Sequence, residues 1–328
     1  NRFRKTFKNI VKTQMLGSAD YINNLSLKYI PEKVKFINPM EQMNQTNIES
    51  NHEPIPKLIE RFKKSSFYKN QISLTSTHRI PSKQAIYDPN FYDEINIHPD
   101  LQALLQSKGM ENVYIHQSIG IKAVLSQQKH VISTTSTSSG KSLLYQLPIL
   151  QSLLTDKNST SLLLFPTKAL SQDQHRALLS FIGDLPSINR DLIKTFDGDT
   201  NKTDRQSIRN SANVILTNPD MLHLTMLPNH KTWSRFLKNL KYVVIDELHT
   251  YKGSFGANVA YILRRLRRAC SLFGNDSIQF ISSSATLNEA SLHLSKMIGL
   301  ENSVDDIVWI DESLNGSPCG ARNIIGWN

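Results

Sequence analysis

Short apolar runs alternate with longer stretches of helical spacing from about residue 98 onward. Each run is nearly continuously hydrophobic, which is typical of strands buried on both faces of a parallel sheet. The stretches between the runs are long enough for crossover helices, so successive runs form βαβ units. The predicted strands are residues 130–134, 162–165, 214–217, 242–245 and 278–281.

The pattern predicts an α/β fold in which helices flank a parallel sheet. Ahead of the first strand, Leu101, Leu104 and Leu105 have helical spacing, and a further helix is expected to run through Val124. The start of the chain mixes apolar patches with Asn, Gln, Ser and Lys, and indicates a partly irregular region. We expect an N-terminal region over 1–80, a helical lead-in over 81–112, the α/β domain over 113–300 and a connecting segment over 301–328.

Composition limits the class of protein. The chain has 328 residues, of which 39% are hydrophobic and 20% charged, and this suits a globular protein. No run of about 18 apolar residues exists, so we expect no transmembrane helix and no membrane partner. The two cysteines, Cys270 and Cys319, cannot build a disulfide scaffold, and this favours a reducing, intracellular compartment.

The positive charge is concentrated at one end of the chain. The formal net charge is +10, and residues 1–80 carry +8 of it. A basic arm on a nearly neutral body suggests contact with a polyanion, nucleic acid first. A solvated leader with no binding role is the alternative.

A candidate phosphate-binding loop follows the first predicted strand. The loop runs from Thr135 to Ser142, and a helical pattern follows it. Backbone N–H groups and a helix N-terminus there would cradle phosphates. Lys141 would contact the β- and γ-phosphates, and the Ser142 hydroxyl would hold Mg²⁺. The other residues expected to line the cradle are Thr137, Ser138, Ser139 and Gly140.

An acidic pair, Asp246 and Glu247, follows the strand at 242–245. Carboxylates at the end of a buried parallel strand lie where open α/β sheets bind ligands. Asp246 is therefore expected to hold Mg²⁺ and Glu247 to polarise an attacking water. An acid pair that is merely solvated at a strand end is the alternative.

Two further features are candidates for reading the nucleotide. Ser283, Ser284, Ala285 and Thr286 stand at the end of the last predicted strand, and the hydroxyls of this cluster are expected to bond across to His249 and so sense the nucleotide state. Gln117 precedes the first strand, where its amide could read an adenine edge. A turn or helix cap is the ordinary interpretation of the first feature, and a surface glutamine that of the second.

Polar residues at two more strand ends can contact phosphates without reading bases. The candidates are Pro166, Thr167, Lys168, Thr217 and Asn218. Ordinary strand-to-helix turns are the alternative. Four arginines between residues 264 and 268 lie in a helical pattern, either as a solvated face or as a nucleic-acid contact.

Taken in chain order, these residues resemble the motor core of superfamily 2 helicases. Residues 195–200, 217–222 and 246–268 are most similar to the RecQ-like DNA helicases of fungi and their bacterial relatives of the MrfA type. The resemblance implies a first RecA-like domain, with ATP and Mg²⁺ as cofactors. Its implied catalytic residues are Lys141, Ser142, Asp246, Glu247 and His249. It also implies 3′-to-5′ movement on single-stranded DNA, unwinding of duplex DNA, and a nuclear role in DNA repair.

This sequence departs from the family pattern in two ways. Thr135 and Ser138 stand where many members have Ala and Gly, which would alter nucleotide affinity. No second RecA-like domain follows, and we expect the chain to be a segment of a longer protein. The missing arginine finger supplies roughly 10³–10⁵ in rate in related sites, so this segment alone should hydrolyse ATP barely.

Three other functions fit part of the pattern. An RNA helicase of the DExH type would carry the same nucleotide motifs, and the 2′-OH would discriminate it from a DNA helicase. A non-catalytic nucleic-acid clamp could use the fold for binding alone. A small-molecule kinase also fits the phosphate loop, but it would not need the Ser284 cluster.

Overall fold

The computed structural model forms two units, residues 1–75 with 326–328 and residues 76–325. In the first unit, α4 (Ile55–Lys63) is a short helix, and β1 (Ile72–Leu74) pairs antiparallel with β11 (Gly326–Trp327). Much of the predicted N-terminal region lies outside the described residues. The structure describes residues 55–66, 68–69, 72–74, 82–183, 185–285, 287–300, 304–320 and 326–327.

The second unit is built on a seven-stranded sheet in which all neighbouring strands are parallel. The strand order is β10-β4-β9-β8-β5-β7-β6. The predicted α/β fold with a parallel sheet is therefore confirmed. The strands are β4 (His130–Ser133), β5 (Thr160–Leu164), β6 (Ile193–Thr195), β7 (Val214–Thr217), β8 (Leu240–Ile245), β9 (Gln279–Ser283) and β10 (Ile307–Ile310).

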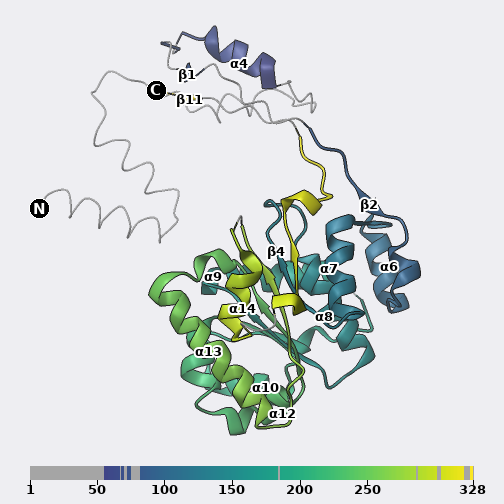
Figure 1. The fold of residues 1–328 in the computed structure, drawn as a ribbon, viewed down its shortest axis with the longest axis vertical. Helices are drawn as coiled ribbons and strands as arrows, with labels where there is room; N and C mark the ends of the chain where they lie inside the picture. Colours follow the sequence, from purple (N-terminus) through teal and green to yellow (C-terminus); the bar gives the residue numbers. More distant parts are fainter. Residues whose placement is uncertain are drawn as a thin grey trace, which may run out of the picture. The chain divides into compact units, whose positions relative to one another are not determined.

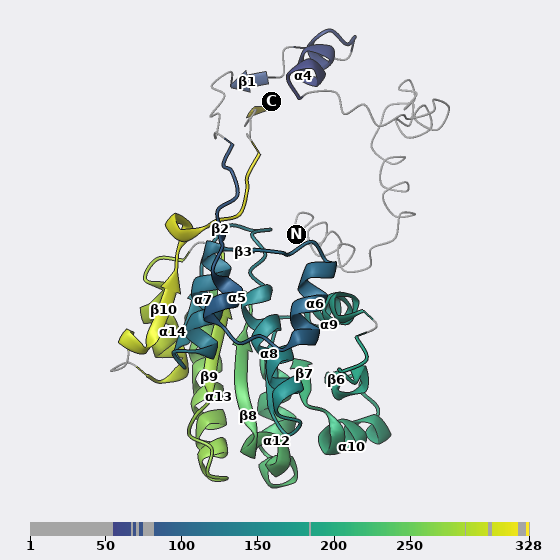
Figure 2. The same ribbon diagram turned by 90° about the vertical axis from the view of Figure 1, so that its right-hand side faces the viewer.

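Helices cover both faces of this sheet. In Figure 1, α13 and α14 lie on one side, and α6, α7 and α8 lie on the other. Figure 2 views the second face, over which α9 also packs. The helices are α5 (Phe91–Glu94), α6 (Pro99–Ser107), α7 (Ile115–Leu125), α8 (Leu143–Thr155), α9 (Lys168–Ile182), α10 (Lys202–Ser211), α11 (Pro219–Met221), α12 (Ser234–Lys238), α13 (Gly253–Ser271) and α14 (Ala290–Ile298).

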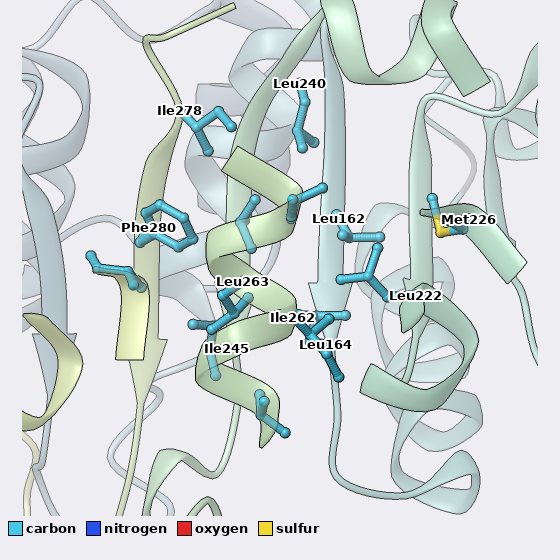
Figure 3. Close-up of a cluster of buried hydrophobic side chains, with 14 of the residues drawn as sticks. Leu162, Leu164, Leu222, Met226, Leu240, Ile245, Ile262, Leu263, Ile278 and Phe280 are labelled. Atoms are coloured by element: carbon cyan, nitrogen blue, oxygen red, sulfur yellow. The ribbon is translucent and has the colours of Figure 1, made fainter. Parts of the chain in front are cut away.

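Alternate residues of each inner strand pack into two separate hydrophobic cores, one on each face of the sheet. On β5, Leu162 and Leu164 join the core under α13, whereas Leu163 joins the core under α8. Figure 3 shows the first of these cores, in which Leu263 of α13 lies over the strands that carry Leu164 and Ile245. Fully burying one such side chain contributes about 1.5–3 kcal/mol. The continuous apolar runs therefore reflect strands that are buried on both faces.

Within the seven-stranded sheet, the two strands that the hydrophobic pattern did not predict are the two edges. β6 has one buried residue, Ile193, and on β10 the Trp309 side chain is 37% exposed. Edge strands bury less of their surface, so their apolar pattern is interrupted. β10 extends the sheet beyond residue 300, where the sequence had placed the end of the domain.

The topology brings the candidate motifs to one edge of the sheet. All seven strands end on the same side, and β9 lies between β4 and β8. The loops that follow these three strands are therefore neighbours, at the carboxyl edge where open α/β sheets bind ligands. Within the described part of the chain, no helix is long and apolar enough to cross a membrane.

Candidate nucleotide-binding site

The predicted phosphate loop connects β4 to the start of α8. Two of its residues have left-handed backbone, Ser138 at φ 65° and Gly140 at φ 79°. A Cβ atom at residue 140 would lie 2.5 Å from Nε2 of Gln117, so glycine fits the close approach there. Ser142 stands at the N-cap of α8, but its side chain makes no capping hydrogen bond. Its hydroxyl therefore does not cap the helix and can bind a ligand.

The amides of this loop face the cradle. Nε2 of His116 lies 3.0 Å from the Ser139 carbonyl oxygen, and Nε2 of Gln117 donates to the Gly140 carbonyl oxygen at 3.0 Å. In a trans peptide the C=O and N–H point in opposite directions, so the next two N–H groups point away from α7. Within the described chain, the N–H groups of residues 138–142 donate to no other residue. Unpaired donors of this kind fit an anionic phosphate.

Lys141 spans the ends of two neighbouring strands. Its Nζ donates to the Thr135 and Ser284 carbonyl oxygens, both at 2.8 Å. Burial lowers the pKa of this ammonium, while the charges of Glu247 and Asp246 act in the opposite direction. The lysine is thus held at the cradle, next to the acidic pair.

The Asp246 carboxylate is fixed by two donors. Its Oδ1 accepts hydrogen bonds from the Ser283 hydroxyl and, at 3.0 Å, from the Glu247 N–H. Burial raises the pKa of Asp246, and the charge of Glu247 adds to the rise, whereas Ser283 and Lys141 oppose it. Glu247 has left-handed backbone, at φ 53°, a strained conformation that is found preferentially at functional sites.

The donor set fits Mg²⁺ only when the nucleotide itself supplies further oxygens. Among the described residues, no cluster of three or more His, Cys, Asp or Glu side chains could hold a metal ion. Proteins commonly hold Mg²⁺ through one or two carboxylates and substrate phosphates. Asp246 and the Ser142 hydroxyl match that chemistry.

The contact between His249 and the strand end of β9 is made by backbone. The Ala285 N–H donates to Nδ1 of His249 at 3.2 Å, and the same nitrogen lies 3.2 Å from the Glu247 carboxylate. The sequence had predicted a hydroxyl in this place. Ser284 Oγ is buried without a partner in the described structure, and Thr286 lies outside the described residues.

Both ends of the Gln117 amide are occupied. Its Oε1 accepts from the Tyr114 N–H at 3.0 Å at the start of α7, while its Nε2 binds the Gly140 carbonyl oxygen. The side chain is 5% exposed. Gln117 thus lies against the phosphate loop, and its contact with an adenine edge stays a prediction.

The predicted DNA contacts at the end of β5 lie beside those at the end of β7, because Leu164 is opposite Thr217 in the sheet. Pro166 is half-buried, and Thr167 caps α9 by accepting from the Leu170 N–H at 3.3 Å. Lys168 forms an ion pair with Asp199, in the loop after β6.

At the end of β7, both candidate side chains form hydrogen bonds within the protein. Thr217 is 1% exposed, and its hydroxyl donates to the Phe196 carbonyl oxygen. Asn218 caps α11 by accepting from the Met221 N–H at 2.9 Å. Of the five predicted DNA contacts, Lys168 is the one that presents a charge at this edge of the sheet.

Three of the α13 arginines hold neighbouring elements. Arg264 donates to the Lys296 carbonyl oxygen at 3.0 Å, and Arg267 donates to the carbonyl oxygens of Ile298 and Gly299 at 2.9 Å. These carbonyls are at the C-terminal end of α14, where cations are favourable. NH1 of Arg265 lies 2.7 Å from the His223 ring. Packing between elements thus accounts for three of the four arginines.

Sequence reasoning missed several residues that hold the site. They are His116, described above, and Glu312 and Asn315, which contact Ser136 in the phosphate loop. None of these three residues carries a local pattern. Ser283 belongs to the predicted hydroxyl cluster, but its hydroxyl donates to Asp246.

The fold and the site together define a P-loop nucleoside triphosphatase: a parallel sheet, a phosphate loop at a helix N-terminus, and an acidic pair on a nearby strand. Residues 114–294 match the family described as DEAD/DEAH box helicase. The chain belongs to this family, and the resemblance predicted from its motifs is confirmed.

The chain is similar to two yeast helicases in sequence and to a solved helicase structure in fold. The chain is 42% identical to ATP-dependent helicase HRQ1 of Saccharomyces cerevisiae, over 94% of this chain and 28% of that protein. It is also 42% identical to ATP-dependent helicase hrq1 of Schizosaccharomyces pombe, over 88% of this chain and 26% of that protein. The crystal structure of the DUF1998 helicase MrfA bound to DNA and AMPPNP matches with a TM-score of 0.71 and 36% identity, over 83% of this chain and 36% of that one. The chain thus spans only a quarter to about a third of these relatives.

Proposed function

We propose that this chain is the first motor domain of an ATP-dependent DNA helicase, which couples ATP hydrolysis to 3′-to-5′ movement on single-stranded DNA and to duplex unwinding. The proposal rests on one observation: the phosphate loop contacts the end of β9, close to the acidic pair after β8, at the carboxyl edge of the sheet. There Lys141 reaches from the phosphate loop to the Ser284 carbonyl oxygen, close to Asp246 and Glu247. The similarity to a MrfA structure that holds DNA and AMPPNP supports DNA as the nucleic acid.

Each site residue has a role that follows from its chemistry. Lys141 and the free loop amides bind the β- and γ-phosphates. Asp246 and the Ser142 hydroxyl would hold Mg²⁺, which would supply positive charge beside the phosphate oxygens. Glu247 orients that water and takes its proton. Gln117 would contact an adenine edge with the donor and acceptor capacity that remains beyond its bonds to Tyr114 and Gly140.

The DNA side of the motor lies along the next strands. Lys168 binds a backbone phosphate through its ammonium. Pro166, Thr167, Thr217 and Asn218 shape the same edge, so contacts there are to the DNA backbone and not to bases. His249, Ser284, Ala285 and Thr286 connect the two functions, because the Ala285 N–H already binds the His249 ring. A second RecA-like domain would complete the site with an arginine finger, and the resemblance to fungal repair helicases supports a nuclear location.

The test compares the ATPase rate of the full-length protein with single-stranded DNA, with matched RNA and with no nucleic acid. We expect stimulation by DNA, and we expect Glu247→Gln to lower kcat by about 10² or more, since general-base catalysis contributes roughly 10²–10⁴. Equal or greater stimulation by RNA would favour an RNA helicase. If neither nucleic acid stimulates hydrolysis, a non-catalytic clamp becomes the better explanation.

A further inference from the structure

The segment that follows β10 forms one wall of the phosphate loop. In this segment, Glu312 accepts a hydrogen bond from the Ser136 N–H through Oε2, at 2.6 Å. Asn315 donates from Nδ2 to the Ser136 hydroxyl at 3.0 Å. Both ends of Ser136, its backbone and its side chain, are thus held by residues that lie more than 170 positions later in the chain.

Asn315 itself is fixed from several sides. The residue is 3% exposed. Its Nδ2 also donates to Glu312 Oε1 at 2.9 Å, and its Oδ1 accepts from the Ser317 N–H at 3.0 Å and from the Ser317 hydroxyl at 2.8 Å. The Lys83 ammonium donates to its carbonyl oxygen. An amide with this many bonds has one orientation, so the contact to Ser136 is specified.

A second route joins the same segment to the far side of the loop. The Gly316 N–H donates to Nδ1 of His116 at 3.2 Å, so the ring proton is on Nε2, which donates to the Ser139 carbonyl oxygen. Burial lowers the pKa of His116 to about 4, so the ring is neutral near pH 7. A Cβ atom at residue 316 would lie 2.4 Å from the Ile86 carbonyl oxygen, so only glycine fits this contact.

We propose that Glu312, Asn315 and His116 are positioning residues for nucleotide binding, which hold the phosphate loop open and so make nucleotide affinity depend on the position of the chain segment after β10. The proposal rests on the proposed function. Ser136 and Ser139 flank the exposed tip of the loop at residues 137–138. When both flanks are held, the loop keeps the backbone course that aims the N–H groups of residues 138–142 at the cradle. Displacement of Glu312 or Gly316 releases one flank.

The direction in which removal of Glu312 changes nucleotide affinity distinguishes a positioning role from a purely electrostatic effect of its charge. The Glu312 charge is close enough to raise the pKa of Lys141, so it also repels an anionic nucleotide. If Glu312 acted through its charge alone, its removal would tighten nucleotide binding. A positioning role predicts weaker binding, because the Ser136 N–H loses its acceptor and the loop gains freedom.

The experiment measures the Kd of a fluorescent ATP analogue for the full-length protein, together with Tm in the absence of nucleotide. Glu312 is exposed, so we expect Glu312→Ala to leave the fold intact. We expect Glu312→Ala and Asn315→Ala each to weaken binding about five- to tenfold, as loss of one charge-assisted or buried hydrogen bond implies. Asp305→Ala is the matched control, because Asp305 is an exposed acid that does not contact the loop, and it should leave Kd unchanged. Unchanged or tighter binding by Glu312→Ala would overturn the proposal.

Two further measurements exclude a merely structural effect. Glu312→Gln keeps an oxygen for the Ser136 N–H and should recover most of the affinity; binding as weak as that of Glu312→Ala would contradict the hydrogen-bond role. Amide hydrogen exchange over residues 136–142 should be faster in both alanine variants, while Tm changes by less than about 2 °C in Glu312→Ala, whose substituted side chain is exposed. Wild-type protein that binds no nucleotide would instead refute the proposed function itself.

Discussion

At the scale of single residues, the charged groups of the site are held by neighbours that take no part in the chemistry. Two carbonyl oxygens hold Lys141, and the Ser283 hydroxyl holds Asp246. Each contact fixes the direction of a charge before any ligand arrives, and such preorganisation is a large part of electrostatic catalysis. The Asp246 carboxylate is half-buried, and its desolvation is a cost to stability.

That cost can be measured with Asp246→Asn. The pKa of Asp246 is raised above its unfolded value of 3.8, so its contribution to stability is present below pH 3.8 and is lost as the pH rises through the folded pKa. Asparagine is neutral and keeps an oxygen at Oδ1, the atom that accepts both hydrogen bonds. We expect Tm without nucleotide to rise by about 2–4 °C at pH 7, the size of about 1 kcal/mol in a domain this large, while ATP hydrolysis is lost.

The control for this prediction is Asp305→Asn, which neutralises an exposed acid and should leave Tm unchanged. The stabilisation by Asp246→Asn should also shrink as the pH is lowered toward 3.8. A fall in Tm at pH 7 would mean that neighbouring groups in the fold compensate the charge of the half-buried Asp246 carboxylate.

The residues of this site differ in how far the sequence could predict them. Lys141, Asp246 and Glu247 were predictable because each belongs to a short local pattern that follows an apolar strand. His116 and Asn315 were not, since their partners lie 200 and 179 residues away in the chain. Nothing local marks a residue whose role is set by a distant contact.

At the scale of elements, the same distinction separates the inner strands from the edges. The five inner strands were predicted within a few residues because both of their faces are buried. β6 and β10 each have one neighbour, and their sequences carry too few apolar positions to be recognised. The ion pair between Lys168, at the start of α9, and Asp199, in the loop after β6, could not be predicted from the sequence either. This pair affects the proposed contact of Lys168 with DNA.

Asp199 occupies the ammonium of Lys168 that we assign to a DNA phosphate. We expect Asp199→Asn to tighten binding of single-stranded DNA about two- to fivefold at low salt. The pair is partly exposed, at 38% for Lys168 and 80% for Asp199, and exposed pairs contribute only about 0–1 kcal/mol. Fluorescence anisotropy with a labelled oligonucleotide measures the change.

The double variant supplies the control for this prediction. In a Lys168→Ala background, Asp199→Asn should have no further effect, because the ion pair no longer exists. If Asp199→Asn tightens binding equally in both backgrounds, Asp199 acts through its general negative charge and not through Lys168.

At the scale of the whole molecule, the charge is distributed unevenly. Residues 1–80 carry +8 of the formal net charge of +10. We expect deletion of residues 1–80 to flatten the slope of log affinity for DNA against log salt, since each phosphate contact adds about 0.9 to that slope for duplex DNA and about 0.7 for single strands. An unchanged slope would identify these residues as a linker.

The position of β4 has a consequence for how the protein is made. This strand carries the phosphate loop and is the first of the seven to leave the ribosome, yet its two neighbours, β9 and β10, are the last. Until Gln279 has been synthesised, β4 has no strand with which to pair, whereas β5, β7 and β8 can already form a sheet. Pairing between distant segments is slow because the loop between them must close first. The nucleotide site therefore assembles only after β9, β10 and Glu312 have been synthesised, and a nascent chain that stops before Glu312 cannot hold its phosphate loop in place.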